Sequence, residues 1–213
     1  MNITKIGHCC LFVEVNGVRL LTDPGCFSDK QNALAHIDAV LITHEHADHL
    51  HIPSLQEVIK NNPDVTVYAN ESTGKLLGEK NIERSIMTEG GVLDIKGVEI
   101  QTWNCDHAEI YEGITPVLNT ALFINNVLLY PGDAFYVPNV GVHTLALPIV
   151  APWCKTSEVI DYAKTIKPTQ CFPVHDGLLH AQHGAPFRML ASKFVEEAGI
   201  KYLDIKEGET FTI

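Results

Sequence analysis

The residues best suited to chemistry in this sequence are three histidines and an aspartate within six positions. His44, His46, Asp48 and His49 form the pattern H-x-H-x-D-H directly after the apolar run 39–42. On a regular strand these side chains would point to opposite faces, so their convergence requires an irregular loop or a helix start. Imidazole and carboxylate groups bind transition metals. The pattern therefore predicts a metal site, the alternative being an exposed polar turn that happens to be rich in histidine.

Three further candidate ligands, His107, Asp133 and His175, lie downstream, each after a run that resembles a strand. Ligands at successive strand ends gather along one edge of a sheet, where α/β proteins often place their sites. Taken singly, a lone histidine is often only hydrogen-bonded, and Gly132-Asp133 could be an ordinary turn. Seven candidates in total exceed the needs of one tetrahedral site. We therefore expect two metal ions.

The elements that must position these residues alternate between strands and helices. Residues 3–21 read as a meander with a hairpin turn at Asn16-Gly17. Further strands are predicted at 39–42, 65–68, two or three times within 86–104, and at 117–124, 127–130, 144–148, 169–172 and 210–213; helices are predicted at 53–60, 71–78, 156–166 and 185–198. Mixed sheets with helices outside them favour a layered α/β sandwich. No repeat or linker divides the chain, so residues 1–213 are expected to form one domain.

Composition and charge indicate which kinds of partner and cellular location suit this chain. The chain has 213 residues, a length that suits one α/β domain, and a formal net charge of −11 without a Lys/Arg cluster, which disfavours a nucleic-acid partner. The six cysteines contain no Cys-x-x-Cys pair, and the N-terminus lacks the apolar run of a signal peptide. We expect free thiols, a soluble cytoplasmic protein, no membrane span, and a small-molecule substrate. The sequence does not predict the oligomeric state.

The motif H44-E-H-A-D-H49, followed by His107, Gly132-Asp133 and His175, resembles the five-part signature of the metallo-β-lactamase superfamily. The segments Ile6-Gly7-His8, Leu21-Thr22-Asp23-Pro24 and Leu145-Ala146-Leu147-Pro148 are similar to a compact branch of metal-dependent hydrolases that includes ascorbate-6-phosphate lactonase. The resemblance spans nearly the whole chain. It implies a four-layer αββα sandwich with the metals at one edge of the paired sheets.

The resemblance also implies a division of the ligands between two divalent metal ions. His44, His46 and His107 would bind the first, Asp48, His49 and His175 the second, and Asp133 would bridge them. Zn²⁺ is the first expectation and Mn²⁺ the second, with Fe²⁺ also compatible with these ligands. Two adjacent cations can generate a bridging hydroxide at neutral pH, and Asp48 is the expected catalytic proton acceptor.

Four other residues are candidates for supporting roles. Family resemblance suggests that Asp23 accepts the second ring N–H of a ligand histidine, although its Asp-Pro-Gly context also suits a plain turn. His8 either lines the pocket or packs as a strand residue. His180 and His183 follow the His175 loop and are candidate substrate contacts.

Several reactions of the superfamily are disfavoured. Flavodiiron proteins carry Glu at the position of His46 and a flavin domain, and secreted penicillin-cleaving zinc enzymes carry Cys at the position of Asp133. Glyoxalase II-like enzymes and transfer-RNA-processing nucleases add a helical region and a basic arm, respectively. The remaining prediction is a dinuclear hydrolase of a small-molecule lactone, ester, amide or phosphodiester. The alternatives are a phosphodiesterase or nuclease acting on nucleic acid, and a metal-bearing sensor domain without turnover.

Overall fold

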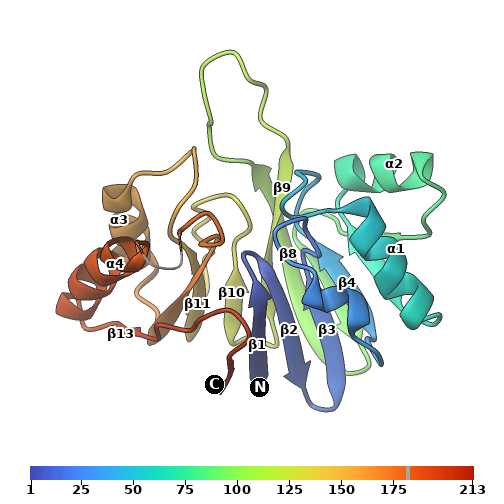
Figure 1. Ribbon diagram of the computed structural model, residues 1–213, viewed down its shortest axis with the longest axis horizontal. Coiled ribbons are helices and arrows are strands. Elements are labelled where there is room, and N and C mark those ends of the chain that lie inside the picture. Colours follow the sequence, from blue (N-terminus) through green and yellow to red (C-terminus); the bar gives the residue numbers. More distant parts are fainter. Residues whose placement is uncertain (181–182) are drawn as a thin grey trace.

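Two mixed β-sheets face each other in the computed structural model, which describes residues 1–180 and 183–213 (Figure 1). Within these residues each sheet has seven strands. The first sheet, in the order β14-β1-β2-β3-β4-β5-β6, comprises β1 (Asn2–Gly7), β2 (Cys10–Val15), β3 (Val18–Thr22), β4 (Ala39–Ile42), β5 (Thr66–Ala69), β6 (Ser85–Ile86) and β14 (Thr210–Thr212). The second, in the order β13-β12-β11-β10-β9-β8-β7, comprises β7 (Gly91–Ile95), β8 (Val98–Asp106), β9 (Leu118–Ile124), β10 (Leu128–Tyr130), β11 (Thr144–Pro148), β12 (Gln170–Val174) and β13 (Lys201–Tyr202).

Helices cover the outer face of each sheet (Figure 1). Helices α1 (Ile52–Asn61) and α2 (Glu71–Glu79) lie on one side of the molecule, and α3 (Thr156–Ile166) and α4 (Ala185–Glu197) on the other. A short 3₁₀ helix spans Lys30–Ala33. The order of layers is therefore helix, sheet, sheet, helix, which confirms the predicted αββα sandwich.

Strand alternation produces these layers, because successive side chains point to opposite faces of a sheet. In β4, Val40 joins the apolar cluster beneath α1, whereas Leu41 points into the cluster between the two sheets. In β11, Leu145 packs toward α3 while Ala146 faces the opposite sheet. Strands with both faces buried read as continuous apolar runs, as 39–42 and 144–148 do.

Strand direction brings the downstream candidate ligands to one edge. Strands β8 and β10 both pair antiparallel with β9, and β10, β11 and β12 are parallel, so β8, β10 and β12 end at the same edge. His107 and His175 directly follow β8 and β12, and Asp133 follows β10 after a short turn. The connection between β8 and β9 projects beyond this edge as the tall loop in Figure 1.

The predicted elements are all present, with small shifts of their ends. Strand β12 runs to Val174 rather than 172, and region 86–104 resolves into β7, β8 and the short β6. Strand β13 and the 3₁₀ helix are additional. All six cysteines are free, and no helix in the described part of the chain is long and apolar enough to cross a membrane.

Candidate metal centre

The H-x-H-x-D-H segment leaves β4 as a tight, irregular turn. The amides of His49 and Leu50 both donate to the carbonyl of His46, at 2.9 and 2.8 Å. The turn also packs directly against the backbone after β3. A Cβ added to Gly25 would lie 1.7 Å from the carbonyl oxygen of Asp48, so only glycine permits this approach. The irregular backbone lets alternate side chains converge on one point.

Hydrogen bonds fix the tautomers of four histidines. Nδ1 lies 2.6 Å from the Ala108 carbonyl in His107, 2.6 Å from the Val150 carbonyl in His175, and 2.7 Å from Asp23 Oδ2 in His49. Each of these oxygens can only accept, so each Nδ1 carries the proton. His44 Nδ1 lies 3.0 Å from Thr43 Oγ1, whose own hydrogen goes to Asp23. All four rings therefore direct Nε2 inward, the nitrogen available to a metal.

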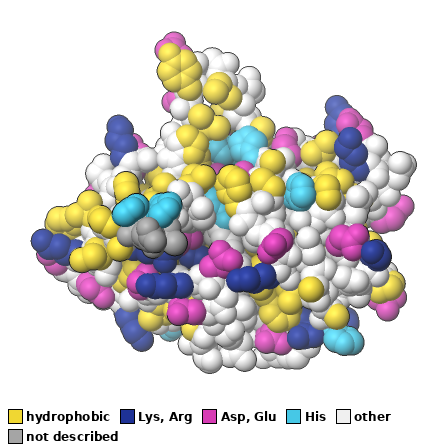
Figure 2. Space-filling view, in the orientation of Figure 1, with side chains coloured by type: hydrophobic (Ala, Val, Ile, Leu, Met, Phe, Trp, Pro, Cys, Tyr) yellow, Lys and Arg dark blue, Asp and Glu magenta, His cyan; other side chains and the backbone are white. Residues whose placement is uncertain are grey.

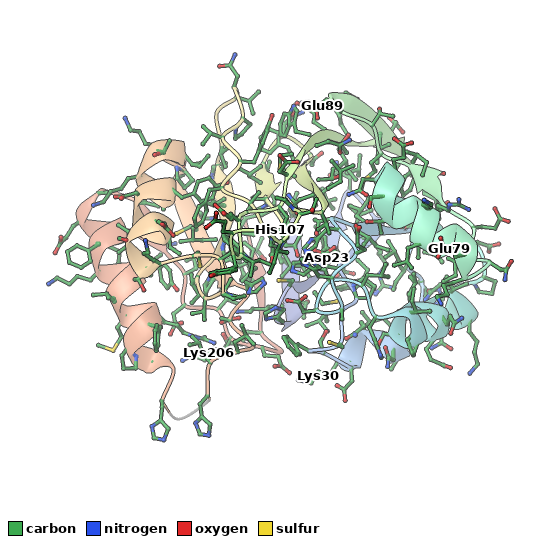
Figure 3. All side chains as sticks on the ribbon, turned by 90° about the horizontal axis from the view of Figure 1, so that it is seen from above. Asp23, Lys30, Glu79, Glu89, His107 and Lys206 are labelled. Carbon is green, nitrogen blue, oxygen red and sulfur yellow. The ribbon has the colours of Figure 1, made fainter. Side chains whose placement is uncertain are left out.

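The inward-facing atoms of the seven predicted ligands form two groups, and His8 and Cys9 form a third group with His49 and His175. One atom from each of His44, His46 and His107 lies within 4.8 Å of the others, and the same holds for the group of Asp48, His49, Asp133 and His175. His44 Nε2 and His46 Nδ1 are only 3.2 Å apart. Two imidazole lone pairs this close repel each other unless a cation or proton lies between them. In Figure 3, His107 and Asp23 lie near the middle of the molecule, well inside its rim.

Three buried polar atoms in this centre lack a hydrogen-bond partner among the described residues: His49 Nε2, His107 Nε2 and Asp133 Oδ1. His49 Nε2 and Asp133 Oδ1 are 3.0 Å apart, but they are not aligned as a hydrogen bond. Buried polar atoms are normally satisfied, and each exception calls for an explanation. A bound cation would satisfy all three, so the residues present fit a metal site.

Asp23 anchors one side of the centre and is fully buried. Its Oδ1 accepts from the Thr43 amide at 2.8 Å, and its Oδ2 accepts from Thr43 Oγ1, His49 Nδ1 and the Tyr130 hydroxyl at 2.7–2.8 Å. The bond from His49 is the contact that the sequence analysis expects of Asp23. A carboxylate that accepts from an imidazole fixes the ring orientation and makes the other nitrogen a better ligand.

Asp133 lies between the two groups. Its Oδ2 is 3.0 Å from His175 Nε2 and 3.3 Å from His107 Nε2, and it accepts a hydrogen bond from the Trp153 indole at 2.8 Å. Gly132 before it adopts φ +63, and an added Cβ would approach Asn119 Oδ1 to 2.2 Å. The Gly-Asp pair is therefore a constrained turn that aims the carboxylate into the centre.

The charges of these groups are strongly coupled. Burial opposes ionisation of Asp48, but hydrogen bonds from His175 and His8 hold the pKa of its carboxyl well below its usual range. Burial lowers the pKa of His44 well below its ordinary value, and the charge of His49 adds to this effect. Burial also opposes a proton on His175, but the charge of Cys9 and hydrogen bonds to Asp133 and Asp48 raise its pKa to about 11. His175 therefore carries a proton on both ring nitrogens at neutral pH in the metal-free protein.

The structure brings all seven predicted ligands together. The four supporting candidates occupy three different surroundings: Asp23 anchors the centre, His8 lies at its edge, and His180 and His183 lie outside it. His8 lies beside Asp48, its Nε2 3.2 Å from Oδ2. His180 and His183 are exposed and stack on each other with ring centroids 4.9 Å apart. His180 lines a cavity of about 400 Å³ beside α4 and β13 whose described lining includes none of the seven. The role of these two histidines as substrate contacts stays a prediction.

Sequence reasoning missed three supporting residues: Thr43, Tyr130 and Trp153. Thr43 stands next to His44, and its position could have been noticed. Tyr130 and Trp153 belong to no motif, because they reach Asp23 and Asp133 only through the fold, across 107 and 20 residues of chain.

The mouth of the centre is apolar. A small hollow beside His46 and His107 is lined by Ile110, Ile114 and their neighbours on the β8–β9 loop. Phe27, 46% exposed, packs edge-on against the His8 ring at 4.9 Å. Figure 2 shows histidines at the base of the projecting loop and hydrophobic side chains along it. No Lys or Arg in the described part of the chain forms an ion pair with any of the seven candidate ligands.

Comparison with known proteins shows which family this chain is similar to in sequence and fold. Residues 2–175 match the family model described as "Beta-lactamase superfamily domain". The chain is 34% identical over 184 residues to Protein Rv0786c of Mycobacterium tuberculosis, covering 84% of this chain and 85% of that protein. It is 26% identical to the UPF0173 metal-dependent hydrolase MK1542 of Methanopyrus kandleri, covering 99% of both. Among solved structures, Igni18, a metallo hydrolase of Ignicoccus hospitalis, has a similar fold with a TM-score of 0.76 at 21% identity, covering 100% of this chain and 98% of that one.

Proposed function

The chain belongs to the β-lactamase superfamily, as a metal-dependent hydrolase, and we propose that it holds two divalent metal ions and hydrolyses a small, uncharged organic substrate. The observation that carries the proposal is the set of inward-facing, partnerless atoms at His49, His107 and Asp133, which a cation would satisfy together. His44, His46 and His107 would hold one ion, Asp48, His49 and His175 the other, and Asp133 lies where it can contact both. Zn²⁺ is the preferred ion, and Mn²⁺ or Fe²⁺ would also suit these ligands.

When bound, the two metal ions would lower the pKa of a coordinated water toward ~7 and so supply a nucleophile at neutral pH. Other residues of the protein hold the ligand side chains in position. Asp23, Val150 and Ala108 accept the outer N–H groups of three ligand histidines and hold their rings. Asp48 is the more accessible carboxylate of the centre, with its side chain 23% exposed, compared with 3% for Asp133.

We assign proton transfer to Asp48 on this difference in access. A group that passes a proton from the attacking water to solvent or to the leaving group must reach both. The lowered pKa of Asp48 means that its carboxylate is ionised at neutral pH. Asp133 is enclosed by three histidines and the Trp153 indole, so it has no such path.

The surroundings support the substrate class. The apolar mouth favours a substrate with an uncharged, apolar portion, because the described residues that line the hollow include no Lys or Arg that could pair with a phosphate or carboxylate. The net charge of −11 further disfavours a nucleic-acid backbone. A lactone, ester or amide fits these surroundings better than a phosphodiester.

A hydrolysis panel tests the proposal. Protein reconstituted with Zn²⁺ or Mn²⁺ should cleave at least one lactone, aryl ester or amide, and chelation should abolish turnover. The matched control is Asp48→Asn with its metal content measured in parallel. Exclusive cleavage of bis(p-nitrophenyl) phosphate or single-stranded nucleic acid would favour the phosphodiesterase alternative. A fully loaded protein that cleaves nothing in the panel would favour a sensor without turnover.

A further inference from the structure

His8 occupies a backbone conformation that side chains rarely adopt, and the chain around it is built to hold it there. It lies in the turn between β1 and β2 with φ 49, and its side chain is almost fully buried. His175 also has a positive φ, 58, and its amide donates to the His8 carbonyl at 3.1 Å. Non-glycine residues in this region cost of order 1–3 kcal/mol each and persist only where surrounding contacts enforce them.

The segment after β12 also fixes the His8 ring. The Gly177 amide donates to His8 Nδ1 at 3.1 Å. A Cβ on Gly177 would lie 3.0 Å from the His8 ring, so the chain passes as close as it can. Because the Gly177 amide can only donate, Nδ1 must be the unprotonated acceptor. A neutral His8 then carries its hydrogen on Nε2.

That hydrogen points at a predicted metal ligand. His8 Nε2 is 3.2 Å from Asp48 Oδ2, so both ring nitrogens of His8 are engaged in hydrogen bonds. A carboxylate oxygen has two lone pairs, so Oδ2 can accept from His8 and still serve a cation. The opposite side of the Asp48 residue is fixed by the close approach of Gly25 to its carbonyl. Phe27 packs edge-on against the His8 ring.

We propose that His8 is a positioning residue: a neutral imidazole, locked by the Gly177 amide, that donates from Nε2 to Asp48 and orients this carboxylate toward the second metal ion. The inference rests on the proposed function only in assuming that a metal binds at Asp48. It differs from that function because it concerns how the carboxylate is held. Asp48 stands on an irregular turn and is partly exposed, and its other close partner, His175 Nε2 at 3.4 Å from Oδ2, would itself serve the metal, so without His8 its side chain could adopt other rotamers.

The wild-type protein gives the first test. Long-range ¹H–¹⁵N NMR spectra of the Zn²⁺-loaded protein should show His8 as the neutral tautomer with its proton on Nε2 and with Nδ1 unprotonated. A proton on Nδ1 would overturn the proposal. This measurement does not depend on turnover or on the folding of a variant.

Two substitutions provide the second test. His8→Gln can still donate through its side-chain amide, whereas His8→Phe keeps a ring but has no donor. We expect His8→Phe to weaken binding of the second metal equivalent about 10–100-fold, as is typical when a partner of a metal ligand is lost. His8→Gln should recover most of that affinity. The absorption spectrum of Co²⁺-loaded protein should change in His8→Phe and return toward wild type in His8→Gln.

The control is His36→Phe. His36 also has a positive φ, 61, but is exposed and has no place in the centre, so metal binding should not change. If His8→Phe binds its second equivalent with wild-type affinity, or if His8→Gln is as impaired as His8→Phe, the role of His8 is only packing. If wild-type protein binds no metal at all, the proposed function fails instead, and the two failures are thus distinguishable.

Discussion

Replacing Asp23 by Asn should destabilise the protein even without metal. Four donors surround this carboxylate: the Thr43 amide and hydroxyl, His49 Nδ1 and the Tyr130 hydroxyl. An asparagine must turn its NH₂ group toward some of them. The less costly orientation leaves the carbonyl facing three donors and sets N–H against the Thr43 amide. Either orientation therefore leaves donors facing donors in a fully buried position.

The size of the effect follows from these contacts. One buried donor left without an acceptor costs about 1–3 kcal/mol, and the three remaining hydrogen bonds lose the benefit of an ionised acceptor. Removing one partner of a buried charged network typically costs about 3–5 kcal/mol, which we take as the expected loss. For a chain of 213 residues this corresponds to a fall in Tm of about 6–20 °C.

Denaturant unfolding and calorimetry of metal-free protein would measure this loss without the stabilisation that bound metal adds. Asp64→Asn, at an exposed loop position, is the matched control and should change stability by less than about 0.5 kcal/mol. An Asp23→Asn protein as stable as the control would refute the four-donor account of this network.

Three other predictions concern the centre itself. Asp133→Asn should reduce metal content, because the charge of Asp133 offsets the repulsion between two cations. Asp48→Asn should instead lower kcat by about 10²–10⁴-fold even at saturating metal. If a metal titration restores wild-type kcat to Asp48→Asn, Asp48 is a ligand only. Trp153→Phe removes the hydrogen bond that the indole donates to Asp133. It should lower the free energy of unfolding of the metal-free protein by about 1.5–3 kcal/mol more than the control Trp103→Phe, whose ring stacks on aromatic neighbours. Equal losses in denaturant unfolding would contradict this. In the folded protein the pKa of His175 is raised to about 11 from an ordinary value near 6.5. Its contribution to the stability of the metal-free protein should therefore be complete below about pH 6.5 and lost as the pH rises toward 11. A free energy of unfolding that does not change over this pH range would contradict the prediction.

The clustering of the seven predicted ligands could be inferred from the sequence, because residue types, spacing and strand-like runs mark their positions. Residue types and spacing mark the first four ligands, His44, His46, Asp48 and His49. The other three, His107, Asp133 and His175, each follow a strand-like run. The strands predicted at 39–42 and 144–148 match β4 and β11, since both are apolar runs buried on two faces. Whether these seven residues bind metal stays a prediction.

What the sequence does not reveal depends on long-range contacts. The Tyr130 hydroxyl meets Asp23 from the opposite sheet, and the amide of Gly177 reaches His8 across 169 residues of chain. No periodicity or motif marks such pairs. Strand β13 was not predicted because its two residues are too few to show alternation. The sequence also does not show the cavity beside α4 that His180 lines together with Asp176 and Gly177, because residues from several separate segments form it.

Metal content of the wild-type protein tests the central claim most directly. Elemental analysis of chelator-free protein, reconstituted with Zn²⁺ and separately with Mn²⁺ and freed of unbound metal, should give about two equivalents per chain, because seven ligand residues exceed one tetrahedral site. The triple variant His44→Ala, His46→Ala, His107→Ala should retain about one equivalent if the two ligand groups are separate sites. A reproducible value of one equivalent or none in the wild-type protein would contradict the dinuclear centre.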